Sequence, residues 1–147
     1  MRVKAKVIIA VCMLAGMLVQ AQETLPQGRW EVKQIIAERN TTGKIDTTVY
    51  NTAAEVKEFM RFPQVLEVKD AKTILLHYPN STENNTMEYT LEYNQLIIKG
   101  IGTWLQYQYS INGGVLILTS MYYFVNNIKQ ENTKNTVETW TFTLNKQ

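Results

Sequence analysis

The sequence is poor in the residues on which most catalytic and metal-binding sites depend. It holds one cysteine, Cys12, and one histidine, His77, among 147 residues. Cys12 lies in a segment that we expect to be removed, so no disulfide and no thiolate remain. One histidine with scattered carboxylates does not make a metal site, and no serine has the surroundings of a nucleophile. We interpret His77 as structural, and we expect no catalytic residue, no metal, no cofactor and no enzymatic activity.

The chain also lacks a large excess of charge of either sign. The chain has 15 basic and 13 acidic residues, and three of the basic ones, Arg2, Lys4 and Lys6, stand at its start. Without those three, the rest has one more acidic than basic residue. A near-neutral chain lacks the positive surface that nucleic acid requires, so we expect no nucleic-acid partner.

The first residues have the pattern of a secretory signal. The basic start is followed by an uncharged run over 7–19 and by Val19-Gln20-Ala21, a small-residue cleavage site. The run is shorter than the ~20 residues of a membrane-spanning helix. An acylated Cys12 is the alternative, although Val11 is branched where a lipoprotein signal has a small residue. We predict a signal peptide over 1–21 and a single domain over 22–147, exported to the periplasm or the outside.

The domain reads as a series of strands with turn residues between them. Hydrophobic alternation or short apolar runs mark strands over 28–32, 65–69, 73–78, 87–93, 96–99, 104–125 and 137–144, the longest being a hairpin that turns at Asn112-Gly113-Gly114. The polar stretch over 40–51 reads as a loop. We predict an all-β fold, in which an antiparallel meander of about eight strands closes as a β-barrel.

One short helix is expected between the first strands. Thr52 and Glu55 have the spacing of a capping box, and Val56, Phe59 and Met60 follow at helical spacing. Since proline ends helices, Pro63 limits this one to the region from Thr52 to Phe62.

Large aromatic residues gather on one face of the predicted sheet. Four of them are tyrosines, whose hydroxyl groups need partners when buried. The face is either a packed core or the wall of a cavity for a small amphiphilic ligand. The candidate ligand-binding residues are Tyr89, Leu105, Tyr107, Tyr109, Leu118, Tyr122, Phe124 and Trp140.

The opposite face of the longest hairpin carries a second apolar row, formed by Val115, Ile117, Met121, Tyr123 and Val125. An exposed row of this kind usually marks an interface with a protein partner or a second copy. The alternative is that the short helix covers it.

The chain resembles an outlying bacterial lipocalin-like protein of the calycin group. Gly28-Arg29-Trp30 is similar to the Gly-x-Trp that opens the first strand of lipocalins, and the order of signal peptide, strand, helix and meander fits over Gly28 to Leu144. The resemblance implies a lipocalin-like barrel that carries a small hydrophobic or amphiphilic molecule. The alternative function is a protein-interaction module, an inhibitor or an accessory subunit of a surface complex, with a filled barrel core.

Overall fold

The structure, a computed structural model, describes residues 24–59, 62–79, 81–82, 85–100, 103–125 and 135–147, without the side chains of 103–104, 122–125 and 135. The predicted signal peptide lies outside these residues. The described part forms nine strands and one short helix: β1 (Gly28–Thr41), β2 (Lys44–Tyr50), α2 (Ala53–Glu58), β3 (Val65–Val68), β4 (Thr73–His77), β5 (Asn85–Glu92), β6 (Gln95–Gly100), β7 (Thr103–Asn112), β8 (Val115–Val125) and β9 (Asn135–Lys146).

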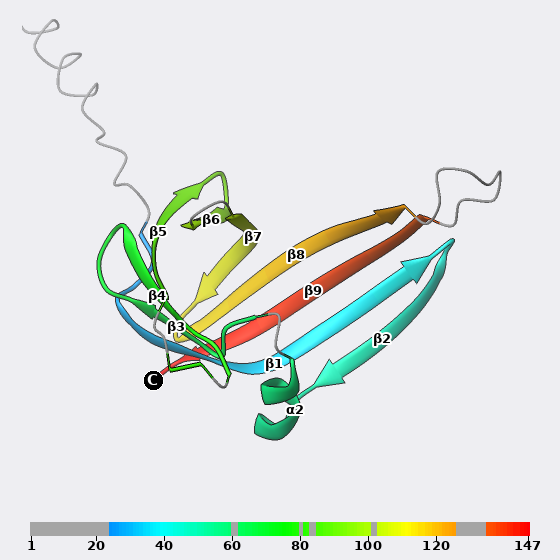
Figure 1. Ribbon diagram of the computed structural model, residues 1–147, viewed down its shortest axis with the longest axis horizontal. Coiled ribbons are helices and arrows are strands. Elements are labelled where there is room, and N and C mark those ends of the chain that lie inside the picture. Colours follow the sequence, from blue (N-terminus) through cyan, green and yellow to red (C-terminus); the bar gives the residue numbers. More distant parts are fainter. Residues whose placement is uncertain (1–23, 60–61, 80, 83–84, 101–102, 126–134) are drawn as a thin grey trace, which may run out of the picture.

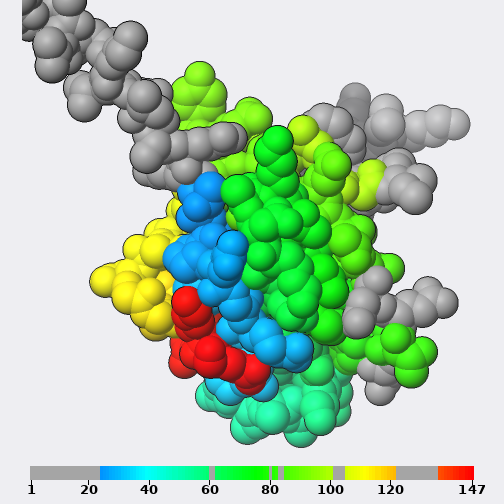
Figure 2. All heavy atoms as spheres, turned by 90° about the vertical axis from the view of Figure 1, so that its left-hand side faces the viewer, coloured from blue at the N-terminus to red at the C-terminus, as the bar shows by residue number. Residues whose placement is uncertain are grey.

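Eight of the strands close into an antiparallel barrel. From β3 to β9 each strand pairs with the next along the chain, and β9 returns to pair with β1. The start of β1 completes the ring by pairing with β3, where Trp30 lies opposite Leu66. Seen from the barrel end, the start of β1 (blue) lies between β3 and β4 (green) and the end of β9 (red; Figure 2). The predicted all-β meander with one short helix is confirmed, and its barrel is compatible with a lipocalin-like fold.

Strand β2 was not predicted, and the expectation of a loop over 40–51 is wrong. Thr42 and Gly43, with φ of 52° and 88°, form a tight turn that folds β2 back along β1. Every residue of β2 except Tyr50 is exposed. The alternation of buried and exposed positions that identifies a strand in a sequence is therefore missing.

The ends of β1, β8 and β9 extend past the barrel, so that the same sheet continues as a flatter four-stranded part. Residues 35–41 of β1, 135–142 of β9 and 119–125 of β8, together with β2, form four strands in the order β2-β1-β9-β8 (Figure 1). We call this part of the sheet the wing. Its inner face continues the barrel interior, where Phe142 and Leu118 are buried, and its outer face carries exposed side chains such as Met121.

The barrel core begins before the first strand. Leu25 is buried, and the carbonyl oxygen of Pro26 accepts a hydrogen bond of 3.1 Å from Nε1 of the fully buried Trp30. The Nζ atom of Lys146, at the end of β9, lies 6.0 Å from the centre of the Trp30 rings. Residues 24–27 are therefore part of the packed domain.

Helix α2 confirms the predicted capping box but is shorter than expected. The hydroxyl of Thr52 accepts from Glu55 N, and the Glu55 carboxylate accepts from Thr52 N at 3.0 Å. The helix ends at Glu58, because Phe59 turns to a ψ of 81°. The Phe59 ring then packs edge-on against Trp140 on the inner face of the wing, 5.2 Å between centres. The helix therefore does not cover the outer row of Ile117 and Met121.

The longest hairpin has the predicted faces where its side chains are described; those of Tyr123 and Val125 in the outer row lie outside the described residues. Its turn is Gly113-Gly114, so that Asn112 pairs with Val115. Leu116, Leu118 and Tyr107 point inward and are buried, whereas Ile117 and Met121 are exposed. In the hairpin of β5 and β6, the strand expected over 87–93 ends at Glu92, because Tyr93 is 98% exposed and lies in the turn with a φ of 50°.

Candidate ligand-binding site

The inner face of the wing changes from apolar to polar with distance from the barrel. Along β9 the inward positions are Phe142, Trp140, Glu138 and Thr136, and each has a partner on β1. Trp140 faces Ala37, Glu138 faces Arg39 and Thr136 faces Thr41. A ligand bound on this face therefore meets aromatic carbon at one end and charged and hydroxyl groups at the other.

A pocket of about 560 Å³ lies on this face beside α2. Its size is that of a site for a small molecule. The walls come from β1, β2, β9 and the segment of α2, and they combine aromatic rings with charged groups. The lining residues are Ala37, Glu38, Arg39, Asp46, Thr48, Tyr50, Glu58, Phe59, Glu138 and Trp140.

Three aromatic side chains form the apolar part of the pocket. The Phe59 ring lies 5.5 Å from Tyr50 and 5.2 Å from Trp140, measured between ring centres. It also lies 5.9 Å from Phe142, which belongs to the barrel core. Phe59 therefore connects the pocket wall with the core, and the position of the pocket depends on where α2 holds this ring.

An ion pair forms the polar end of the pocket. Both Nε and Nη2 of Arg39 donate to Oε1 of Glu138, with 2.8 Å from Nε. Glu138 is only 7% exposed, so its carboxylate depends on this partner. Beyond the pair, the hydroxyls of Thr41 and Thr136 lie 3.2 Å apart.

One buried hydroxyl on the same face stands without a partner. Ser120 lies opposite Trp140 and is 5% exposed, and within the described part of the chain its Oγ atom makes no hydrogen bond. Such groups are uncommon in folded proteins, because losing water without gaining a partner is unfavourable.

Most of the predicted ligand-binding residues lie in the barrel core instead of the pocket. Of the predicted set, Trp140 lines the pocket, Tyr89, Tyr107 and Leu118 are buried in the core, and Leu105 and Tyr109 pack against it. The side chains of Tyr122 and Phe124 lie outside the described residues, although both residues pair with β9 through the backbone. Whether these residues bind a ligand stays a prediction.

Core side chains from three separate segments of the chain lie against one another. Phe62 stacks on Phe142 with 3.8 Å between ring centres, and the rings of Tyr107 and Phe62 are perpendicular with 5.6 Å between their centres. The hydroxyl of Tyr89 donates to the carbonyl oxygen of Asp70 at 3.0 Å. Burial raises the pKa of Tyr89 and also that of Tyr78. Around these rings, the barrel interior is occupied by protein.

Nine of the ten residues that line the pocket were not predicted from the sequence, among them Arg39, Tyr50, Phe59 and Glu138. Glu138 had a usable signal, because it follows the same alternation as Trp140 and Phe142 and so had to point inward. Tyr50 had none, since the stretch around it was assigned to a loop. Phe59 was expected on the helix face, and its contact with Trp140 needs the three-dimensional structure.

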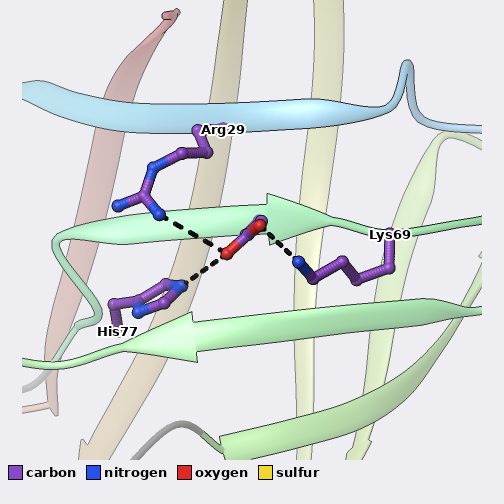
Figure 3. A network of polar contacts seen from close by, with 4 residues as sticks. Arg29, Lys69 and His77 are labelled. Atoms are coloured by element: carbon purple, nitrogen blue, oxygen red, sulfur yellow. Dashed lines mark hydrogen bonds and ion pairs between the residues drawn. The ribbon is translucent and has the colours of Figure 1, made fainter. Parts of the chain in front are cut away.

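A polar network on the outside of the barrel explains the single histidine. The carboxylate of Glu67 on β3 lies between Arg29, Lys69 and His77 (Figure 3). Nε2 of His77 is 3.0 Å from Glu67 Oε2, and Nη1 of Arg29 is 3.5 Å from the same oxygen. Hydrogen bonds from Lys69 and His77 hold the pKa of Glu67 below its usual range. His77 thus has a structural partner, as interpreted from the sequence.

The described residues contain neither a cluster of metal-ligating side chains nor a membrane-spanning helix. No group of three His, Cys, Asp or Glu side chains in this part of the chain is arranged to hold a metal ion. Nor does a helix here have the length and apolar character needed to cross a bilayer.

Comparison with known proteins yields no relative. No family model, no curated protein and no solved structure matches this chain.

Proposed function

We propose that this protein is an exported, non-enzymatic lipocalin-like binding protein whose ligand is a small amphiphilic molecule held in the wing pocket. The observation that carries the proposal is the gradient of the inner face, from the rings of Phe59 and Trp140 to the Arg39–Glu138 ion pair. The rings take the apolar body of the ligand, and the ion pair takes its polar group.

A comparison of two leucine substitutions tests the pocket. Ala37 lines it opposite Trp140, so Ala37→Leu places a larger side chain in the space that the ligand needs. Ala54 is exposed on α2, so Ala54→Leu makes the same change outside the pocket. The probes are anilinonaphthalene sulfonate and the neutral N-phenylnaphthylamine, titrated by fluorescence.

The expected result is saturable binding to the wild type and to Ala54→Leu. Binding to Ala37→Leu should be weaker by about tenfold or more, which corresponds to roughly 1.4 kcal/mol. Equal affinity of all three proteins, or no saturable binding of either probe to the wild type, rules out the pocket as the site.

The proposed export also has a direct test. Leu25 already packs into the core, so cleavage after Ala21 leaves the folded domain whole. We expect N-terminal sequencing of the protein from the periplasm or medium to start at Gln22. An intact Met1, or an N-terminal acylated Cys12, contradicts this.

A second candidate function rests on the outer face of the wing. Ile117 is 37% and Met121 is 55% exposed, in a row with Val115. This supports the protein-interaction module, an inhibitor or accessory subunit that binds a protein partner. If that is the function, Ile117→Glu with Met121→Glu abolishes the partner's binding and leaves the binding of both probes unchanged.

A further inference from the structure

Strand β2 is an open edge of the sheet. It pairs with β1 and stands at the end of the strand order, so no other described strand lies along its outer side. In Figure 1 it forms the free border of the wing, away from the barrel. Free strand edges are usually protected by bulges, prolines or charges, because they can pair with another chain.

The outward backbone groups of β2 follow from its turn. The positive φ angles of Thr42 and Gly43 make a two-residue hairpin turn, which closes on a hydrogen-bonded pair of Thr41 and Lys44. Hydrogen-bonded and open pairs then alternate along the two strands. The N–H and C=O groups of Ile45, Thr47 and Val49 therefore point away from β1, and three donors and three acceptors line the edge.

The side chains of these three residues favour association with another strand and do not protect the edge. Ile45 is 60% and Val49 is 44% exposed, and both lie on the outer face with Thr47 between them. The charged residues of the strand, Lys44 and Asp46, alternate onto the other face. This edge thus combines backbone groups that pair with no described strand and β-branched side chains on the outer face.

We propose that two copies of the protein associate through β2, with the strands antiparallel and Thr47 on the two-fold axis. In this register Ile45 lies opposite Val49 of the second copy, and Val49 opposite its Ile45. All six outward groups of each strand find partners, giving six hydrogen bonds across the axis. The two wings become one continuous sheet of eight strands.

Neighbouring registers are less favourable. A shift toward the hairpin turn places Asp46 opposite Asp46 of the second copy, and like charges directly opposite are destabilising. A shift away from the hairpin turn places Ile45 beyond the end of β2 of the second copy, with no residue of that strand opposite it. A two-fold arrangement also closes after two copies, whereas pairing of β2 with a different edge continues into a chain of molecules.

Sedimentation velocity of the purified protein tests the proposal, with a pair of charge variants to test the register. A seven-residue edge is a small interface, so the measurements run from about 1 to about 300 µM. The wild type should reach twice the monomer mass in this range. Ile45→Glu with Val49→Glu sets like charges opposite each other across the axis and should stay monomeric.

Ile45→Lys with Val49→Glu decides the register. It places opposite charges across the same axis, so the dimer should return. A monomeric wild type, an unchanged dimer in the double glutamate variant, or no recovery in the lysine–glutamate variant overturns the proposal. Circular dichroism and thermal melting confirm that the variants are folded, which is expected because both positions are exposed.

A cross-link provides a second, independent readout. Thr47 faces itself across the axis, and cross-strand Cα atoms of a hydrogen-bonded pair lie ~5.5 Å apart, within disulfide reach. In a Cys12→Ser background, Thr47→Cys should form a covalent dimer on mild oxidation. Thr48→Cys, on the other face and off the axis, should not; equal cross-linking of the two contradicts the arrangement. The pairing does not depend on ligand binding, and Ala37→Leu should leave it unchanged.

Discussion

The Arg39–Glu138 ion pair holds a buried carboxylate on the inner face of the wing. The two partners differ in exposure to solvent: the Glu138 side chain is 10% exposed and the Arg39 side chain is 64% exposed. Glu138 therefore depends on Arg39 more than Arg39 depends on Glu138, because water still reaches the guanidinium group.

Removing Arg39 should destabilise the protein more than removing both charges. Arg39→Ala leaves the buried Glu138 carboxylate without its partner, and we expect a loss of about 1–3 kcal/mol in the free energy of unfolding. Adding Glu138→Gln to the same variant should recover part of that loss. Urea unfolding of the two single variants and the double variant measures the coupling; simple additivity of the single effects contradicts it.

Glu67 should make the free energy of unfolding depend on pH in the acidic range. Its pKa in the folded protein is lowered, mainly by the hydrogen bond from Lys69 and then by that from His77. Because the Glu67 carboxyl loses its proton more readily in the folded protein, its ionised form stabilises the fold. This stabilisation is fully present above the pKa of the unfolded chain, near 4.5, and is lost as the pH falls through the pKa of the folded protein.

Glu67→Gln should therefore be less stable than the wild type at pH 7, with the difference shrinking toward pH 3. Thermal melting at a series of pH values measures this. Glu92→Gln, at an exposed position of β5, is the control and should show no such convergence. A constant difference for Glu67→Gln across the series contradicts the prediction.

At the scale of elements, α2 is too short to be stable by itself and depends on its cap and on packing. It has six residues, and isolated helices of that length do not persist in water. The capping box supplies partners for backbone groups at its start, and Val56 and Phe59 attach it to the sheet. The helix is thus the element that sets one wall of the pocket.

Thr52→Ala should loosen that wall. Loss of the cap costs about 1 kcal/mol, and Phe59 then holds its place against Trp140 less firmly. We expect lower stability to urea together with weaker probe binding. Thr52→Ser keeps the hydroxyl and should behave as the wild type in both assays, so a loss in the serine variant means that the cap is not the cause.

At the scale of the whole molecule, closure of the barrel brings distant segments into one core. Phe62 from the segment after α2, Tyr107 from β7 and Phe142 from β9 meet there as neighbouring rings. Tyr107 is 4% exposed, and its ring centre lies 5.6 Å from that of Phe62 and 6.3 Å from that of Phe142, so the ring is packed within this cluster.

Tyr107→Ala tests whether the barrel interior is a packed core. With the observed ring contacts, the substitution opens a new cavity and should cost about 3–5 kcal/mol of unfolding free energy. Tyr93→Ala removes the same side chain at a fully exposed turn and should cost far less. A small loss for Tyr107→Ala instead indicates a preformed cavity at this ring, as expected of a barrel that carries a ligand in its interior.

Local patterns in the sequence were sufficient for much of the fold. The alternation of Trp140, Phe142 and Leu144 identified the inward face of β9, and Asn112-Gly113-Gly114 located the turn of the longest hairpin to within one residue. Thr52 and Glu55 marked the start of α2. Each of these features depends on neighbours within a few residues along the chain, so periodicity and turn chemistry identify it.

The wing and its pocket were decided only by the tertiary structure. Strand β2 buries nothing but part of Tyr50, so its existence depends on pairing with β1 and leaves no apolar pattern. Arg39 and Glu138 are 99 positions apart and meet because closure of the barrel aligns β1 with β9. Contacts across such distances are selected by the packing of the whole core, which no local pattern contains.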